Sequence, residues 1–93
     1  MDAADWPPIL VLGRDTCEDS TRSRAHLTAR AIPFAYRNVE FDPEADAINR
    51  SYNDGNRVTP VILIGDPGRP ARVVVEPSND DLDAAIAEVA ATR

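Results

Sequence analysis

Apolar side chains in this chain are concentrated in short runs that are separated by turn-forming and charged segments. Ile9–Leu12 is apolar at every position and Val58–Ile64 is nearly so, which is typical of central strands covered on both faces. Phe34–Phe41 mixes aromatic, β-branched and polar residues and predicts another strand, whose change of phase indicates a bulge or an edge position. Arg72–Glu76 follows a segment rich in proline and glycine, so it predicts an antiparallel hairpin with the strand before it.

Three helices are predicted between and after these strands. The first spans about Cys17 to Ala31, with Thr16 as its expected N-cap. Pro33 ends this helix, because proline forces the preceding residue out of helical geometry. The apolar stripe of the helix is thin and consists of Ala25, Leu27, Thr28 and Ala31.

The second predicted helix begins after Asp42, an N-cap acid that is followed by proline at the first helical position. Ala45, Ile48 and Tyr52 form one face of it, and it ends in a turn-rich cluster at residues 53–56. Ser78 is the expected N-cap of the third helix. The apolar face of that helix has strict helical spacing and consists of Leu82, Ala85, Ile86 and Val89.

The predicted order of elements is βαβαββα, an α/β class with a four-stranded mixed sheet and helices on both faces. A helical crossover makes the first two strands parallel, and the closing hairpin is antiparallel. Because the two inner runs are the most apolar, we expect the Ile9–Leu12 strand to lie between the second and third strands, with the last strand at an edge. Residues 1–93 are expected to form a single domain.

Composition excludes several functional classes. The chain has 93 residues, with 16 acidic against 10 basic side chains and a net charge of -6, which argues against nucleic acid as the main partner. A single cysteine excludes an internal disulfide and a CxxC metal site. No apolar stretch is long enough to cross a membrane, and the acidic N-terminus does not resemble a signal peptide. We therefore expect a cytoplasmic protein.

The only cysteine, Cys17, lies between a strand and a helix. Unpaired N–H groups and the dipole of a helix N-terminus favour a thiolate. Ser20 completes a C-x-x-S spacing on one helix face, and its hydroxyl either donates to the thiolate or simply occupies the first turn. The negative charges of Asp15, Glu18 and Asp19 destabilise the thiolate. We therefore expect the pKa of Cys17 to lie below its ordinary value but above the value that it would have beside an uncharged loop. The alternative is a buried, unreactive thiol.

Three landmarks together resemble the glutaredoxin branch of the thioredoxin superfamily, over the range Ile9–Ala90. The first is Cys17 directly after the first strand. The second is Val58-Thr59-Pro60 at the start of the third strand, where the family has a cis-proline. The third is the acidic opening of the last helix, where the family's two glycines are replaced here by Pro77-Ser78.

The resemblance implies a binding groove for glutathione or another low-molecular-weight thiol, which acts as co-substrate. Arg14 and Arg57 would meet the glycine carboxylate, or else are surface residues that offset nearby acids. Thr59, before the cis-proline Pro60, would pair its backbone with the peptide. Asn79 and Asp80 would meet the γ-glutamyl end. The family's glycine-phenylalanine type, which holds an iron–sulfur cluster, is not matched, so neither a metal nor a cluster is assigned.

Three functions are consistent with this sequence. The first is a monothiol thiol-disulfide oxidoreductase in which Cys17 acts on glutathione mixed disulfides of protein thiols, with Ser20 as the second active-site residue. The second is a binding module that keeps the groove without the chemistry. The third is a redox sensor whose cysteine is reversibly capped. We favour the first, and we expect a monomer.

Overall fold

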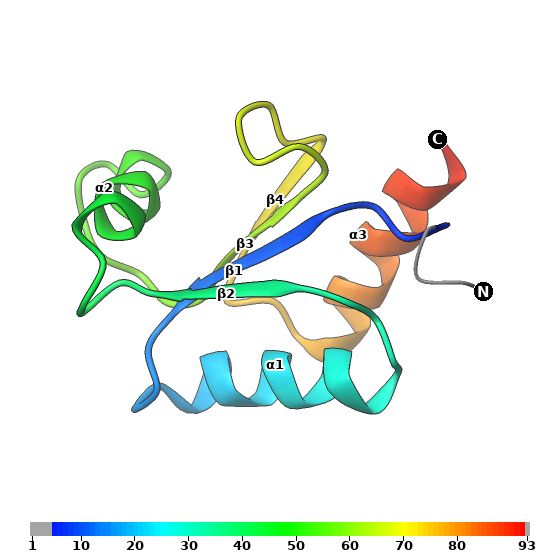
Figure 1. Ribbon diagram of the computed structural model, residues 1–93, viewed down its shortest axis with the longest axis horizontal. Coiled ribbons are helices and arrows are strands. Elements are labelled where there is room, and N and C mark those ends of the chain that lie inside the picture. The colour runs from blue at the N-terminus through cyan, green and yellow to red at the C-terminus, as the bar shows by residue number, and fades with distance from the viewer. Residues whose placement is uncertain (1–4, 93) are drawn as a thin grey trace.

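The computed structural model describes residues 5–92. Its elements alternate as the sequence predicts, and Figure 1 shows their arrangement. In chain order they are β1 (Ile9–Gly13), α1 (Glu18–Ala29), β2 (Ala35–Asn38), α2 (Pro43–Ser51), β3 (Val61–Ile64), β4 (Arg72–Val75) and α3 (Asn79–Ala91).

The strands form one mixed sheet in the order β2-β1-β3-β4. β1 pairs in parallel with β2, placing Val11 beside Tyr36, and pairs antiparallel with β3, placing Val11 beside Ile62. β4 returns antiparallel to β3 and lies at the edge. This confirms the predicted strand order, the position of β1 inside the sheet, and the mixed topology.

Helices cover both faces of the sheet, and this explains why β1 is apolar at every position. Ile9 and Val11 point to the face packed by α1 and α3, whereas Leu10 and Leu12 point to the face packed by α2. In Figure 1, α1 and α3 lie on one side of the strands and α2 on the other. All five residues of β1 are buried, so neither of its faces tolerates a polar side chain.

Two of the three predicted helix starts have the expected caps. The carboxylate of Asp42 accepts a hydrogen bond from the Ala45 N–H at 3.1 Å, with proline at the first helical position. The hydroxyl of Ser78 accepts one from the Asp81 N–H at 3.0 Å. The apolar face predicted for α3 is also confirmed, because its four members are all buried: Leu82, Ala85, Ile86 and Val89.

The start of α1 differs from the prediction. Cys17, not Thr16, is the N-cap, and no side chain caps the helix. The backbone N–H of Cys17 donates to Arg14 O at 3.3 Å, which closes a tight turn just before the helix. That turn places the first helical residue at Glu18, one position later than predicted.

The buried face of α1 also differs from the prediction. Ser20, Ser23 and Leu27 are buried, whereas Ala25, Thr28 and Ala31 are exposed. Small hydroxyl side chains allow the helix backbone to approach the sheet closely, so burial follows this polar face and not the alanine stripe.

The prediction for α2 is only partly correct. Ala45 is buried, but Asn49 is fully buried and Tyr52 is 41% exposed. The amide of Asn49 donates to Val58 O at 2.7 Å and its oxygen accepts from the Val58 N–H at 3.0 Å. This polar side chain can be buried because both its N–H donor and its oxygen acceptor have hydrogen-bond partners. This pair ties α2 to the segment that leads into β3.

Three strands are shorter than predicted, and β4 is the least affected because it ends at Val75 instead of Glu76. β2 covers Ala35–Asn38, since the Asn38 side chain accepts from the Glu40 N–H at 2.9 Å and turns the chain. β3 begins only at Val61, after a cis Thr59–Pro60 peptide bond, which agrees with the prediction for that bond.

The end of β1 is packed directly against the first turn of α1. A Cβ atom added at Gly13 would lie 2.6 Å from Ser20 Oγ and 2.9 Å from Ser20 Cβ. Ser20 is itself fully buried. The absence of a side chain at Gly13 therefore sets how closely α1 approaches the sheet.

We predict that Gly13→Ala lowers the free energy of unfolding by about 1–3 kcal/mol, the usual cost of overpacking a core. Denaturant titration followed by circular dichroism measures this. Gly68→Ala is the matched control, since its added Cβ would meet only Asp66 Oδ1, at 3.5 Å. Equal stability of the two variants would contradict the packing argument.

Candidate functional site

Cys17 occupies the N-cap of α1 and is partly exposed. Its carbonyl accepts from the Thr21 N–H at 3.0 Å, which begins the helical hydrogen bonds. A thiol at an N-cap faces the unpaired N–H groups of the first turn, where negative charge is stabilised. This confirms the predicted placement of the cysteine at a helix N-terminus.

A shallow depression of about 410 Å³ opens beside the thiol. It brings together Cys17 and three more residues that the sequence analysis selected, from segments far apart in the chain. Its lining consists of Arg14, Cys17, Arg57, Val58, Thr59 and Glu76. The turn after β1 and the approach to β3 therefore meet at one place.

Opposing effects act on the thiol, and the pKa of Cys17 lies below its ordinary value. Burial acts to raise this pKa, but the hydroxyl groups of Ser20 and Thr59 and the backbone N–H groups of Ser20 and Asp19 lower it. These donors stabilise the thiolate. When protonated, the Cys17 thiol donates to Thr59 O, with Sγ and O 3.5 Å apart.

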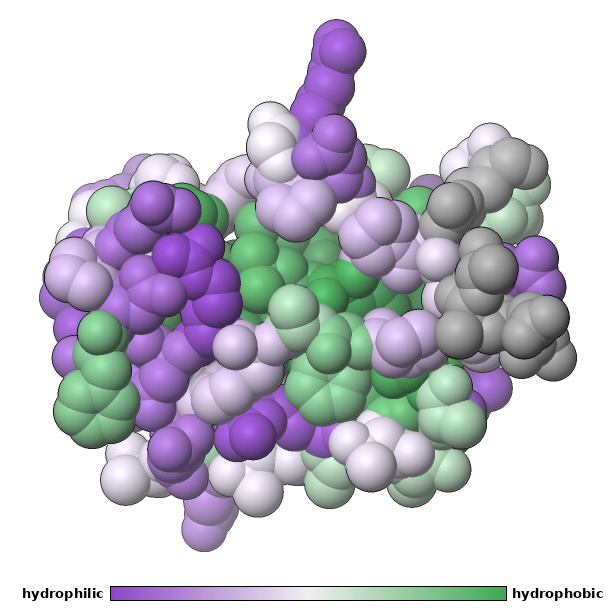
Figure 2. Space-filling view, viewed as in Figure 1, coloured by the Kyte–Doolittle hydropathy of each residue, from purple (hydrophilic) through white to green (hydrophobic). Residues whose placement is uncertain are grey.

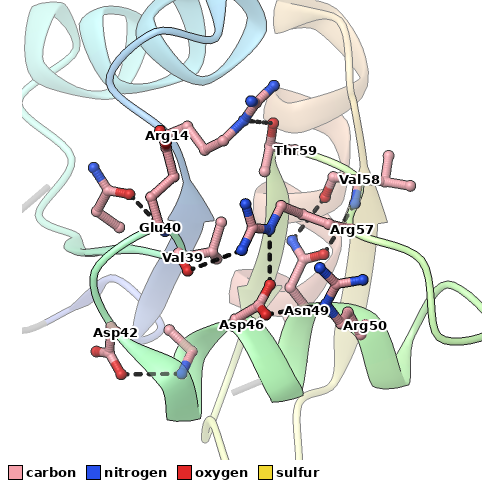
Figure 3. Close-up of polar contacts among 12 residues, drawn as sticks. Arg14, Val39, Glu40, Asp42, Asp46, Asn49, Arg50, Arg57, Val58 and Thr59 are labelled. Carbon is pink, nitrogen blue, oxygen red and sulfur yellow. Dashed lines mark hydrogen bonds and ion pairs between the residues drawn. The ribbon is translucent and has the colours of Figure 1, made fainter.

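Arg14 orients both hydroxyl donors. Its backbone N–H donates to Ser20 Oγ at 3.2 Å, and its Nε donates to Thr59 Oγ1 at 3.4 Å, as Figure 3 shows for the second contact. Each hydroxyl thus accepts from Arg14, which leaves its own proton free to donate to the sulfur. The Ser20 hydroxyl lowers the pKa of Cys17, which favours the first of the two roles considered for it, as a donor to the thiolate.

Two of the acidic residues around Cys17, Asp15 and Asp19, are paired with other groups. Asp15 accepts from the Tyr36 hydroxyl at 2.7 Å and lies 3.4 Å from Arg24. Burial and Asp15 together raise the pKa of Tyr36 to about 12, so the phenol remains a donor. Asp19 pairs with Arg22 at 2.8 Å. These contacts reduce the opposition of both carboxylates to a thiolate.

Arg57 lies in the depression but is already paired. Its Nε donates to Asp46 Oδ1 at 2.8 Å and its Nη2 to Val39 O at 3.5 Å, as Figure 3 shows. Hydrogen bonds from Arg57 and Arg50 hold the pKa of Asp46 below its usual range, so this carboxylate stays charged. The α2 end of the molecule carries many such charged and polar groups, which dominate the left of the surface in Figure 2.

The structure does not bring every predicted residue into the depression. Pro60 is buried and does not line the depression, and Asn79 and Asp80, at the start of α3, do not line it either. The Oδ1 atom of Asn79 is buried and accepts no hydrogen bond from the residues described. A role for Asn79 and Asp80 in binding stays a prediction.

Glu76 is a residue of the depression that sequence reasoning missed. The signal was present in the predicted hairpin: antiparallel pairing of Val61 with Val75 brings the residue after β4 beside the residues before β3. The Glu76 N–H accordingly donates to Pro60 O at 2.9 Å.

Within residues 5–92, no group of three or more His, Cys, Asp or Glu side chains is arranged to hold a metal ion. No helix in the described part of the chain is both long enough and apolar enough to span a membrane.

Strand order, a cis-proline beside the site, and a single cysteine at a helix N-terminus define a thioredoxin-like protein of the glutaredoxin type. The family model for glutaredoxin matches residues 9–67, more than half of the chain. The chain therefore belongs to the glutaredoxin family. Comparison with the curated proteins gives no significant match.

Solved structures share this fold at low sequence identity. The glutaredoxin-like NrdH-redoxin of Escherichia coli is 23% identical to this chain, with a TM-score of 0.67. The matched region covers 83% of this chain and 92% of the NrdH-redoxin chain. Glutaredoxin of Brucella melitensis is 24% identical with a TM-score of 0.61, covering 90% and 83%. Glutaredoxin grx-1 of Archaeoglobus fulgidus is 19% identical with a TM-score of 0.62, covering 82% of each chain.

We predict that Ser20→Ala raises the pKa of Cys17, because it removes a hydroxyl that stabilises the charged form. At neutral pH the thiolate fraction falls, so alkylation by iodoacetamide slows. The far-ultraviolet absorbance of the thiolate, followed against pH, measures the pKa directly.

Ser23→Ala is the matched control for this prediction. Ser23 is also fully buried in α1, and its hydroxyl has no hydrogen-bond partner among the described residues. An equal change in the pKa of Cys17 in both variants would show that helix packing, and not the Ser20 hydroxyl, sets the pKa.

Proposed function

We propose that this chain is a thiol-disulfide oxidoreductase that acts by a monothiol mechanism on mixed disulfides between proteins and a low-molecular-weight thiol. The observation that supports it most is the environment of Cys17, where two hydroxyls and two backbone N–H groups lower the pKa of a partly exposed thiol. A lowered pKa increases the thiolate fraction at a given pH, and the thiolate is the nucleophile in disulfide exchange. Family membership gives glutathione as the first candidate thiol.

The reaction balances without a metal or an external oxidant. The Cys17 thiolate attacks the small-thiol sulfur of a mixed disulfide and releases the protein thiolate, which takes up a proton. Cys17 then carries the small thiol in a new disulfide. A second small-molecule thiolate attacks the sulfur of that thiol, frees Cys17, and leaves as the small-molecule disulfide.

A second cysteine in the chain is not required for this sequence of steps. Cys17 is the only cysteine of the sequence, and Ser20 stands where a dithiol enzyme would have its resolving thiol. A dithiol mechanism, in which the chain closes its own disulfide, has no second sulfur here. The structural neighbour from Escherichia coli is described as having a thioredoxin-like activity profile. We propose the monothiol route for this chain.

The first test is turnover. The protein, with glutathione, glutathione reductase and the mixed disulfide of glutathione with β-mercaptoethanol, is expected to consume NADPH at a rate proportional to its concentration. Cys17→Ser should abolish that rate, whereas Ser23→Ala should keep it, because Ser23 lies outside the depression.

Failure of this test has two distinguishable forms. If Cys17 is alkylated readily in the folded protein but no turnover occurs, the chain is a sensor or a binding module. If Cys17 is not alkylated until the protein unfolds, the thiol is structural and the proposal is wrong.

Arg14 and Arg57 provide the second test, which concerns the carboxylate of the small thiol. Arg14 has no acidic partner among the described residues, while Arg57 is paired with Asp46. We therefore expect Arg14→Ala to weaken glutathione binding by about tenfold or more, since a hydrogen bond to a charged group contributes roughly 1.5–3 kcal/mol. Arg57→Ala is expected to have a smaller effect.

NMR titration with glutathione measures these affinities. Arg69→Ala is the control, because Arg69 is exposed in the β3–β4 turn and lies outside the depression, yet its loss changes the net charge equally. If Arg14→Ala and Arg69→Ala change the glutathione affinity equally, the carboxylate of glutathione does not bind at Arg14. Asp46→Asn, which frees Arg57, should strengthen binding.

A further inference from the structure

A carboxylate lies in the depression beside the reactive thiol. Glu76 follows β4 and lines the depression together with Cys17 and Arg14. It is exposed, and its carboxylate makes no hydrogen bond or ion pair with the described residues. It is therefore available to a ligand.

The backbone holds Glu76 in an unusual conformation. Its φ is 47°, in the left-handed region that residues other than glycine rarely adopt, and it precedes Pro77, which further restricts it. Ala31 and Asp54 also have positive φ, but they follow helices, where this conformation commonly ends the helix.

The element directly before Glu76 is the strand β4, so helix termination does not account for its conformation. Its N–H donates to Pro60 O at 2.9 Å. The next residue, Pro77, is buried, and its carbonyl accepts from Arg22 Nη2 at 3.1 Å. Strained residues of this kind tend to occur at functional sites. The hairpin and α1 thus hold the backbone of Glu76 beside Pro60, at the edge of the depression that Cys17 also lines.

The charges of the depression do not add up to a cationic site. Asp46 pairs with Arg57 at 2.8 Å, so this arginine contributes little net charge. Arg14 and Glu76 remain as one cation and one anion, in a protein of net charge -6. A substrate group next to Glu76 is therefore favoured when it is positive and disfavoured when it is negative.

We propose that Glu76 determines the charge preference of exchange at Cys17, so that disulfides carrying an ammonium group near the sulfur react faster than those carrying a carboxylate. The substrate class is an aminothiol whose ammonium group lies near the sulfur. This inference rests on the proposed function, since it concerns the same exchange step. In that step the Cys17 thiolate forms a disulfide with one half of the reagent and releases the other half as a thiolate.

Three small disulfides of different charge test the inference. Cystamine is a dication, 2-hydroxyethyl disulfide is neutral, and 3,3′-dithiodipropionate is a dianion at neutral pH. Their rates of mixed-disulfide formation with Cys17 are measured by quenching and mass spectrometry, and each rate is divided by the thiolate fraction. We expect cystamine to react faster than the dianion, and the neutral reagent is the reference for both.

Glu76→Gln is expected to reduce the ratio of the cystamine rate to the dithiodipropionate rate by at least about fivefold, the effect of one unit charge at contact distance in water. The rate with 2-hydroxyethyl disulfide should not change. Asp54→Asn is the control, since Asp54 is exposed, lies outside the depression and has a left-handed backbone that asparagine tolerates.

Two results would overturn the inference while leaving the proposed function intact: an unchanged ratio in Glu76→Gln, or an equal fall in Asp54→Asn. An unchanged ratio would show that the Glu76 carboxylate does not act on the substrate. An equal fall in Asp54→Asn would show that only the net charge of the protein matters. If Cys17 reacts with none of the three reagents in the folded protein, the proposed function fails and the inference fails with it.

Discussion

The close packing of α1 against the end of β1 is the contact on which the site depends. Gly13 leaves room for Ser20, and Ser20 Oγ accepts from the Arg14 N–H at 3.2 Å. This contact fixes the tight turn at Cys17 and aims the first turn of the helix at the thiol. A side chain at Gly13 would push α1 outward and displace the hydroxyl that lowers the pKa of Cys17. The same contact thus serves both packing and reactivity.

The second constraint is the arrangement of charge. Carboxylates near a thiolate oppose its charge, and here two of the four nearby acids have cationic or hydroxyl partners. Asp15 is held by Tyr36 and Arg24, and Asp19 by Arg22. These pairs are exposed and contribute little to stability individually. Their role at this site is to reduce the negative field around the sulfur.

Much of the fold could be predicted because its signals are local. Uniform burial of β1 makes it apolar throughout, and Asp42 and Ser78 cap their helices with side chains placed directly at the helix start. The face of α1 could not be read in this way, because its buried residues are serines, which periodicity counts as polar. The burial of Ser20 depends on its close contact with Gly13, and a local sequence pattern does not show such a tertiary contact.

The site was predictable to a similar extent. The resemblance to glutaredoxins located Cys17, Thr59 and Arg14, which the structure does bring together. It did not show that Arg57 is paired with Asp46, since that contact depends on how α2 packs on the sheet. Glu76 was missed because a residue at the end of a strand carries no motif. Only the register of the hairpin places it in the depression.

The central claim is that the folded structure makes Cys17 a better nucleophile than an ordinary cysteine. The most direct test is the pH dependence of its alkylation by iodoacetamide in the native protein and in the same protein unfolded in denaturant. The account predicts that the native midpoint lies below that of the unfolded chain, which should be near the free value of about 8.5. A native midpoint equal to or above the unfolded one would contradict it.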